Sequence, residues 1–306
     1  MSVCGYAPSR VRLSVAMHRA ACAALMRRRL STKPPTRFDV GGSTLLIRQH
    51  FFDDGPVPQP HGSRRHADGT GLKVWPTALP LLFHLRRMLP QLRRSIGVGE
   101  RRRLRVLELG SGCGLLGCGL GLLGCDVVTT DPSLDVNFFS SEDESGGGNT
   151  LEWLRSNVEL NAAAIGEARV HVAKYAWGDA ADEEALRGSA LGRHGFDVVV
   201  GSDLLYDPDR YPELAASIAA FACTSAEAAA AVAAGQSPVA AILGYPRRHG
   251  GEERFLRLCE APRHPRLTVG ETVALTQRHA AAASAPAAPA RMVASLLHAG
   301  PGSGSG

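Results

Sequence analysis

The chain has 306 residues, enough for one large domain or two small ones. Hydrophobic residues make up 44% of it and charged residues 21%, which excludes a wholly disordered protein, and no run of 18 apolar residues predicts a membrane-spanning helix. The net charge of +5 is unevenly spread, because residues 1–37 hold eight basic residues and no acidic one. The remaining residues hold 26 basic and 29 acidic side chains, a net charge of −3. This negative charge argues against a nucleic-acid binder of the usual basic kind.

The cysteines and histidines predict neither a disulfide framework nor a metal site. The seven cysteines are scattered along the chain, and no C-x-x-C pair occurs among them. The eleven histidines show no spacing typical of metal ligands. We therefore expect no bound metal.

Residues 1–36 form a leader that we exclude from the fold. Its segment AMHRAACAALMRRRLST is rich in Arg and Ala and has no acid, which is typical of an organellar transit peptide. An unstructured Arg-rich extension explains the same composition equally well. We accordingly expect a cytoplasmic protein, or a mitochondrial or plastid one if the leader is a targeting signal.

The first predicted elements are a β-hairpin and a helix. Apolar residues flank the Gly-Gly-Ser turn of RFDVGGSTLLIRQH, which indicates the hairpin. The helix is predicted over residues 71–89, because apolar side chains from Trp75 to Leu89 recur on one face and Pro76 suits a first helical turn.

From residue 104 onward, strands and helices alternate. Such alternation predicts an α/β fold with a mostly parallel sheet covered by helices on both faces. Beyond Leu267 the pattern dissolves, so the final strands cannot be placed. The predicted strands span residues 104–109, 126–131, 169–177, 196–206 and 238–246, and the predicted helices span residues 115–124, 150–164, 211–223 and 252–260.

The composition also sets the expected domain limits. We expect one folded domain over residues 37–275, followed by a low-complexity tail over residues 276–306 that holds an uncertain last strand. Within these limits, the acidic and Gly-rich segment 140–149 is expected to be a mobile loop, and the Ala/Pro-rich segment 279–290 lacks the bulk to pack a core.

The sharpest motif is the glycine loop ELGSGCG, residues 108–114, directly after the first parallel strand. Glycines let the backbone turn tightly and approach a ligand where a Cβ would collide. The pattern is not the Gly-x-Gly-x-x-Gly of a dinucleotide site, because Leu115 stands where the last glycine is needed, and it lacks the Gly-Lys-Ser/Thr of a phosphate-binding loop. Its acid-x-Gly-x-Gly-x-Gly form looks like motif I of S-adenosylmethionine (SAM) methyltransferases.

Two further positions follow predicted strands. Asp131 closes the second strand, where a carboxylate can accept hydrogen bonds from both ribose hydroxyls of an adenosine, although the nearby Asp135 competes for this role. Asp203 and Tyr206 form an Asp-x-x-Tyr motif at the end of the fourth strand, and this edge should face the same cleft. There, an Asp and a Tyr can hold and orient a nucleophile.

Taken in order, the motifs resemble one family. They run from TLLIRQH and GLKVWPTALPL through VLELGSGCGLLG, VVTTD and LEWLRSNVELN to YAWGD, FDVVVGSDLLYDP and ILGYPRR. This series is similar to that of the seven-β-strand protein-lysine methyltransferases called methyltransferase family 16, of the methyltransferase-like 21 type. The resemblance spans about Phe38 to Leu258 and implies a Rossmann-like, seven-stranded class I SAM-dependent methyltransferase domain.

The resemblance also implies roles for residues, and it places SAM as the cofactor. Asp203 and Tyr206 would be the catalytic residues, with Asp203 by the methionine end of SAM and Tyr206 bordering the lysine channel. Asn157 and Asn161 match a helix of the family and are expected to be structural, and Trp153 is expected to be packing. The cofactor-binding residues would be Trp75, Glu108, Gly110, Ser111, Gly112, Gly114, Asp131, Trp177 and Ser202.

The function implied is methyl transfer from SAM to a lysine ε-amine of a protein substrate, by a monomer that binds neither nucleic acid nor membrane. The alternatives are a SAM methyltransferase acting on a small molecule, on arginine or on nucleic acid, and a catalytically silent SAM-binding interaction protein. The Asp-x-x-Tyr position lacks the Asn-Pro-Pro-Tyr of amino-directed nucleic-acid methyltransferases, which weighs against nucleic acid as the acceptor.

Overall fold

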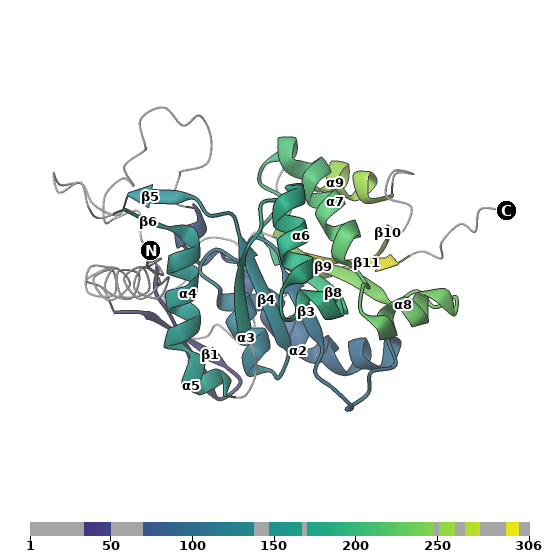
Figure 1. Ribbon diagram of the computed structural model, residues 1–306, viewed down its shortest axis with the longest axis horizontal. Helices are drawn as coiled ribbons and strands as arrows, with labels where there is room; N and C mark the ends of the chain where they lie inside the picture. Colours follow the sequence, from purple (N-terminus) through teal and green to yellow (C-terminus); the bar gives the residue numbers. More distant parts are fainter. Residues whose placement is uncertain are drawn as a thin grey trace, which may run out of the picture.

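Figure 1 shows the computed structural model of the chain. It describes residues 34–49, 70–137, 147–166, 170–247, 251–260, 267–275 and 292–299, and the structural statements below concern these residues. Nearly all of the leader, most of the acidic and Gly-rich segment, and the Ala/Pro-rich segment 279–290 lie outside the described ranges.

The described strands form a seven-stranded main sheet and two small sheets. The main sheet has the order β10-β11-β9-β8-β3-β4-β7 and is parallel from β9 to β7, whereas β11 runs antiparallel to both of its neighbours. Chain order reverses beside β3, and parallel sheets bind ligands at the carboxyl ends of such strands. The strands are β3 (Arg105–Glu108), β4 (Asp126–Asp131), β7 (Val170–Lys174), β8 (Val198–Ser202), β9 (Val239–Pro246), β10 (Leu267–Ala274) and β11 (Met292–Ala299).

Helices cover both faces of this sheet. In Figure 1, α2 lies on one side of the strands and α6, α7 and α9 lie on the other. The predicted Rossmann-like class I fold is therefore confirmed. The helices are α2 (Ala78–Ser95), α3 (Leu115–Leu122), α4 (Thr150–Leu160), α5 (Ala162–Ile165), α6 (Ala180–Gly188), α7 (Tyr211–Phe221), α8 (Ala226–Ala233) and α9 (Gly251–Glu260), with 3₁₀ turns η2 (Thr70–Leu72), η3 (Gly192–His194) and η4 (Pro208–Arg210).

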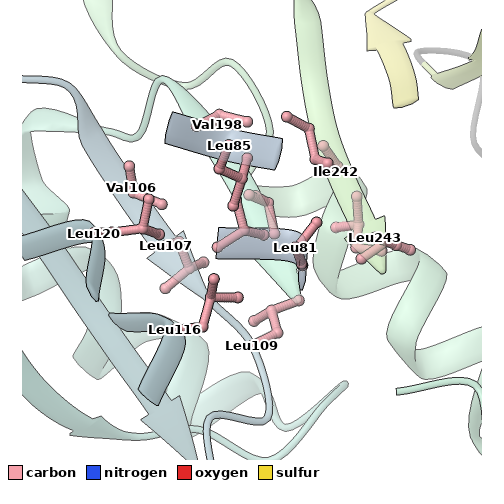
Figure 2. Close-up of a cluster of buried hydrophobic side chains, with 14 of the residues drawn as sticks. Leu81, Leu85, Val106, Leu107, Leu109, Leu116, Leu120, Val198, Ile242 and Leu243 are labelled. Carbon is pink, nitrogen blue, oxygen red and sulfur yellow. The ribbon is translucent and has the colours of Figure 1, made fainter. Parts of the chain in front are cut away.

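The buried core explains why the central strands are short apolar runs in the sequence. Figure 2 shows leucines of α2 and α3 meeting the side chains of β3, β8 and β9 in one cluster. Every residue of β4 is buried, as is every residue of β9 except Pro246, because helices cover both faces. The sheet is therefore a rigid base, and its loops carry the functional residues. The labelled side chains are Leu81, Leu85, Val106, Leu107, Leu109, Leu116, Leu120, Val198, Ile242 and Leu243.

The predicted hairpin is confirmed as β1 (Thr36–Val40) and β2 (Ser43–Ile47), and asparagine side chains attach it to the domain. The Asn161 amide accepts from the Leu46 N–H and donates to its carbonyl, both at 2.8 Å. The Asn157 amide does the same for Arg48, at 2.8 and 3.1 Å. The expected structural role of both asparagines is thus confirmed, because their amides replace a neighbouring strand.

The helix predicted over residues 71–89 is shifted. Thr77 is its N-cap and the helix runs on through Pro90 to Ser95, so Trp75 and Pro76 precede it. The segment before the helix is bonded instead to the residues that follow β2, because the Val74 N–H donates to Gln49 Oε1 at 2.8 Å. The segment 71–76 therefore lies outside α2 and contributes to the cavity described below.

The sheet extends past the expected domain limit at residue 275. The last strand, β11, lies between β9 and β10, with Ser295 buried beside Tyr245. The segment expected as a mobile loop also has structure at its end, since β6 (Gly147–Asn149) pairs with β5 (Asp135–Asn137).

Among the described residues, no single helix is long and apolar enough to cross a membrane. One bent pair, residues 208–221 with 226–233, meets the criteria of length and composition only.

Candidate functional site

One cavity of about 310 Å³ lies at the carboxyl ends of β3, β4 and β8. All eleven residues that the sequence analysis assigned to cofactor binding or catalysis line it. They come from five separate stretches of the chain, which only the parallel sheet brings together. The cavity is therefore the candidate active site. The residues are Trp75, Glu108, Gly110, Ser111, Gly112, Gly114, Asp131, Trp177, Ser202, Asp203 and Tyr206.

The glycine loop needs its glycines for both conformation and space. Gly110, Gly112 and Gly114 have φ values of +58°, +51° and +81°, in the left-handed region that other residues rarely adopt. A Cβ on Gly110 would lie 2.6 Å from Leu204 Cδ2, and one on Gly112 would lie 3.2 Å from the Gly71 carbonyl oxygen. The loop can therefore hold its turn against the neighbouring segments only without side chains.

Glu108 is a buried acid at the base of the cavity. Thr129 Oγ1 donates to its carboxylate at 2.6 Å. Burial raises the pKa of the Glu108 carboxyl to about 7, while hydrogen bonds from Thr129 and Ser111 oppose the shift. Ser111 also accepts the Thr130 N–H at 3.0 Å, so its hydroxyl joins the loop to β4.

Asp131 ends β4 and also holds the glycine loop. The Gly112 N–H donates to Asp131 Oδ2 at 2.9 Å. Burial raises the pKa of the Asp131 carboxyl to about 6, and the bond from Gly112 lowers it. The carboxylate thus lies at the cavity wall with a fixed orientation, where a ligand with paired hydroxyls can reach it.

Two tryptophans form apolar walls. Trp177 follows β7, and its Cζ2 would lie 3.3 Å from a Cβ on Gly110, so the ring packs on the glycine loop. Within the described ranges, its buried indole N–H has no hydrogen-bond partner. Trp75 also lines the cavity, with Lys73 Nζ 5.8 Å from its ring centroid. An unpartnered buried donor in a cavity wall is a place where a ligand can accept a hydrogen bond.

The third side of the cavity follows β8. Asp203 has a φ of +58°, unusual for a residue other than glycine, and its carboxylate accepts from the Thr77 hydroxyl at 2.8 Å and the Thr77 N–H at 3.2 Å. Tyr206 is 52% exposed and lies at the mouth. An anion is therefore fixed inside the cavity, with an aromatic side chain at the entrance.

Several lining residues were missed by the sequence analysis, including Gly71, Lys73, Leu204 and Arg210. Gly71 and Lys73 were assigned to a helix, which hid their place in the cavity wall. Arg210 donates to the Trp177 carbonyl at 3.1 Å, a contact across 33 residues that no local pattern signals. Trp153, expected as packing, is buried and donates to the Arg48 carbonyl.

Comparison with known proteins gives the family. The family model described as "Lysine methyltransferase" matches residues 63–261. Two proteins named "Protein N-lysine methyltransferase METTL21A" are similar to the chain. The protein from Mus musculus is 26% identical over 182 residues, which are 60% of this chain and 63% of that protein. The protein from Danio rerio is 27% identical over 146 residues, which are 48% and 53%.

The chain thus spans less than two thirds of the length of these relatives. Among solved structures, the SAM-dependent methyltransferase from Agrobacterium tumefaciens is 14% identical, covering 89% of this chain and 71% of that one, with a TM-score of 0.43. Because the family model covers more than half of the sequence, the chain belongs to the lysine methyltransferase family.

Proposed function

We propose that this protein transfers a methyl group from SAM to a lysine ε-amine of a protein substrate. The observation that carries the proposal is the convergence of the glycine loop, Asp131 and the Asp-x-x-Tyr motif on one cavity. The family description and the names of the two relatives support lysine as the acceptor.

The residues of the cavity fit SAM. Its volume of about 310 Å³ is at the small end of the range for ligand sites. The glycine loop lines the cavity at Gly110 and Gly112, and Asp131 offers a carboxylate for ribose hydroxyls. The Trp177 N–H, which lacks a partner among the described residues, offers a donor beside the loop. When bound, SAM would supply an electrophilic methyl group on a sulfonium.

The chain's own residues would then align the acceptor. A lysine amine is protonated at neutral pH, with an unperturbed pKa of about 10.4, so it must lose a proton before it can attack. Apolar walls such as Trp75 and Leu204 disfavour the charged form, and the proton leaves to water through the mouth at Tyr206. Asp203 and Tyr206 orient the amine, and alignment supplies most of the catalysis.

For the acceptor, we propose a protein rather than a nucleic acid. Outside residues 1–37 the chain holds 26 basic and 29 acidic residues, so this part has no excess of positive charge to draw a phosphate backbone. The exposed Tyr206 at the cavity mouth suits contact with an aliphatic lysine stem.

Labelled methyl transfer tests this proposal. The purified protein is incubated with SAM carrying a tritiated methyl group and a cell extract freed of endogenous SAM, and the labelled material is treated with protease, nuclease or neither. We expect label in protein that protease removes and that is recovered as methyl-lysine after hydrolysis. Label that survives protease, or label recovered as methyl-arginine, would contradict the proposal.

A further inference from the structure

Thr77 forms two hydrogen bonds with Asp203, a residue of the cavity wall. Its hydroxyl donates to Asp203 Oδ1 at 2.8 Å, and its N–H donates to Oδ2 at 3.2 Å. Each carboxylate oxygen thus accepts one bond from the same residue, and both residues are buried. Two bonds from one neighbour fix the plane of the carboxylate as well as its position.

The Thr77 hydroxyl does not serve the helix that it begins. Thr77 is the N-cap of α2, a position where a threonine side chain ordinarily accepts an N–H of the first turn, but it makes no such bond. By contrast, the side chains of the N-cap residues of α4, α6 and α8 each accept a hydrogen bond from the backbone N–H three positions later in the chain. These residues are Asn149, Asp179 and Ser225. The donor capacity of Thr77 goes to Asp203 and its acceptor oxygen is not used for capping.

The backbone of Asp203 is also held in one conformation. Its φ of +58° lies in the left-handed region, and its N–H donates to the Gly244 carbonyl at 2.8 Å. Non-glycine residues hold this conformation only where the surrounding structure over-determines it, and such residues cluster at functional sites. The backbone bond to β9 and the two bonds to Thr77 together hold the Asp203 carboxylate in the wall of the cavity, next to Ser202.

We infer that Thr77 is the positioning residue of Asp203. It holds the Asp203 carboxylate at the end of the cavity where methyl transfer takes place, so that the anion meets the positive charge of the bound cofactor and the charge that develops on the amine nitrogen as it is methylated. The inference rests on the proposed function, because it assigns that end of the cavity to the methyl group. Without the Thr77 hydroxyl, the carboxylate loses one of the two bonds by which Thr77 orients it.

Two cofactor analogues test the inference without a protein substrate. S-adenosylhomocysteine has a neutral sulfur at the reacting position, whereas sinefungin has an amine-bearing carbon there. Their affinities are measured by calorimetry. We expect the wild type to bind sinefungin about tenfold or more tightly than S-adenosylhomocysteine, because a hydrogen bond between charged groups has that effect. In Thr77→Val this preference should fall to about threefold or less, while the affinity for S-adenosylhomocysteine stays the same.

Further variants separate positioning from folding. Thr77→Ser keeps the hydroxyl and should restore the preference. Ser225→Ala removes another hydroxyl that donates to a buried carboxylate, that of Asp197, at a helix N-cap outside the set of residues lining the cavity, and it should leave the preference unchanged. If Thr77→Val does not fold, Thr77→Ala removes the same hydroxyl and Asp203→Asn removes the charge that it orients, and each should lower the preference to about threefold or less.

The outcomes distinguish two failures. A wild type that binds neither analogue would overturn the proposed function and the inference with it. A wild type that binds both analogues equally, a Thr77→Val protein that keeps the preference, or a Thr77→Val protein that loses both affinities in parallel would overturn the role of Thr77 and leave the proposed function standing.

Discussion

Glu108 is a carboxyl group at the end of β3 whose surroundings disfavour its charge. Burial raises its pKa to about 7 from 4.5. Below about pH 4.5 the group is protonated in both the folded and the unfolded chain, so burial adds no ionisation cost. As the pH rises from 4.5 towards 7, the unfolded chain ionises first, and the free energy of unfolding falls. Above pH 7 the full cost remains.

Glu108→Gln should therefore remove this pH dependence of the free energy of unfolding. Relative to this variant, the wild type should lose on the order of 3 kcal/mol of unfolding free energy between pH 4.5 and 7.5, because each pKa unit corresponds to about 1.4 kcal/mol. Urea denaturation across this range measures the effect, and Glu100→Gln, at an exposed glutamate, is the control. Parallel curves for wild type and Glu108→Gln would contradict the burial argument.

At the residue scale, the order of motifs along the chain was sufficient to find most of the cavity. Asp131 and Asp203 could be placed because each follows a predicted parallel strand, and such strands end at one edge of the sheet. The bond between Thr77 and Asp203 could not be predicted, since it joins residues 126 positions apart. The helix predicted over residues 71–89 includes Thr77, and nothing in its apolar spacing shows the Thr77 hydroxyl turned towards Asp203.

At the scale of elements, the attachment of the hairpin depends on α4. The Asn161 amide bonds the backbone of Leu46 in β2, the Asn157 amide bonds that of Arg48 just after β2, and both asparagines are buried. Replacing Asn161 by Leu leaves the half-buried N–H and carbonyl of Leu46 without these partners. We expect a loss of about 1–3 kcal/mol in unfolding free energy, and faster hydrogen exchange in residues 43–47.

Chemical denaturation and hydrogen exchange measure both effects. Arg155→Ala changes an exposed side chain of the same helix and should alter neither. Unchanged exchange in β2 of the Asn161→Leu protein would show that the hairpin is held by other contacts.

The elements that were predicted least well from the sequence are those whose position depends on contacts with neighbouring elements. The start of α2 is set by Thr77 and by the bond from Val74 to Gln49, not by apolar spacing, which continues smoothly from Trp75. The strands β10 and β11 have weak patterns because one is half exposed and the other is buried on both faces. Only the pairing of β11 with β9 and of β10 with β11 identifies them.

At the scale of the whole molecule, β11 completes the sheet from beyond residue 275. It separates β9 from β10 and pairs with both. A chain ending at Leu275 would leave the edge of β9 unpaired and β10 without its neighbour, so we expect loss of cooperative unfolding or aggregation. A chain ending at Ala299 should melt as the full chain does. A cooperative transition at an unchanged Tm for the chain ending at Leu275 would contradict this role of β11.

Methyl transfer by this protein requires that the cavity over the glycine loop bind SAM. A calorimetric titration of the full chain tests it most directly. We predict saturable binding of SAM, no binding of NAD, and affinity for SAM at least about tenfold weaker in Asp131→Asn, which keeps an acceptor for the Gly112 N–H but loses the carboxylate. Absence of SAM binding by the wild type, or equal affinity in the variant, would contradict the account.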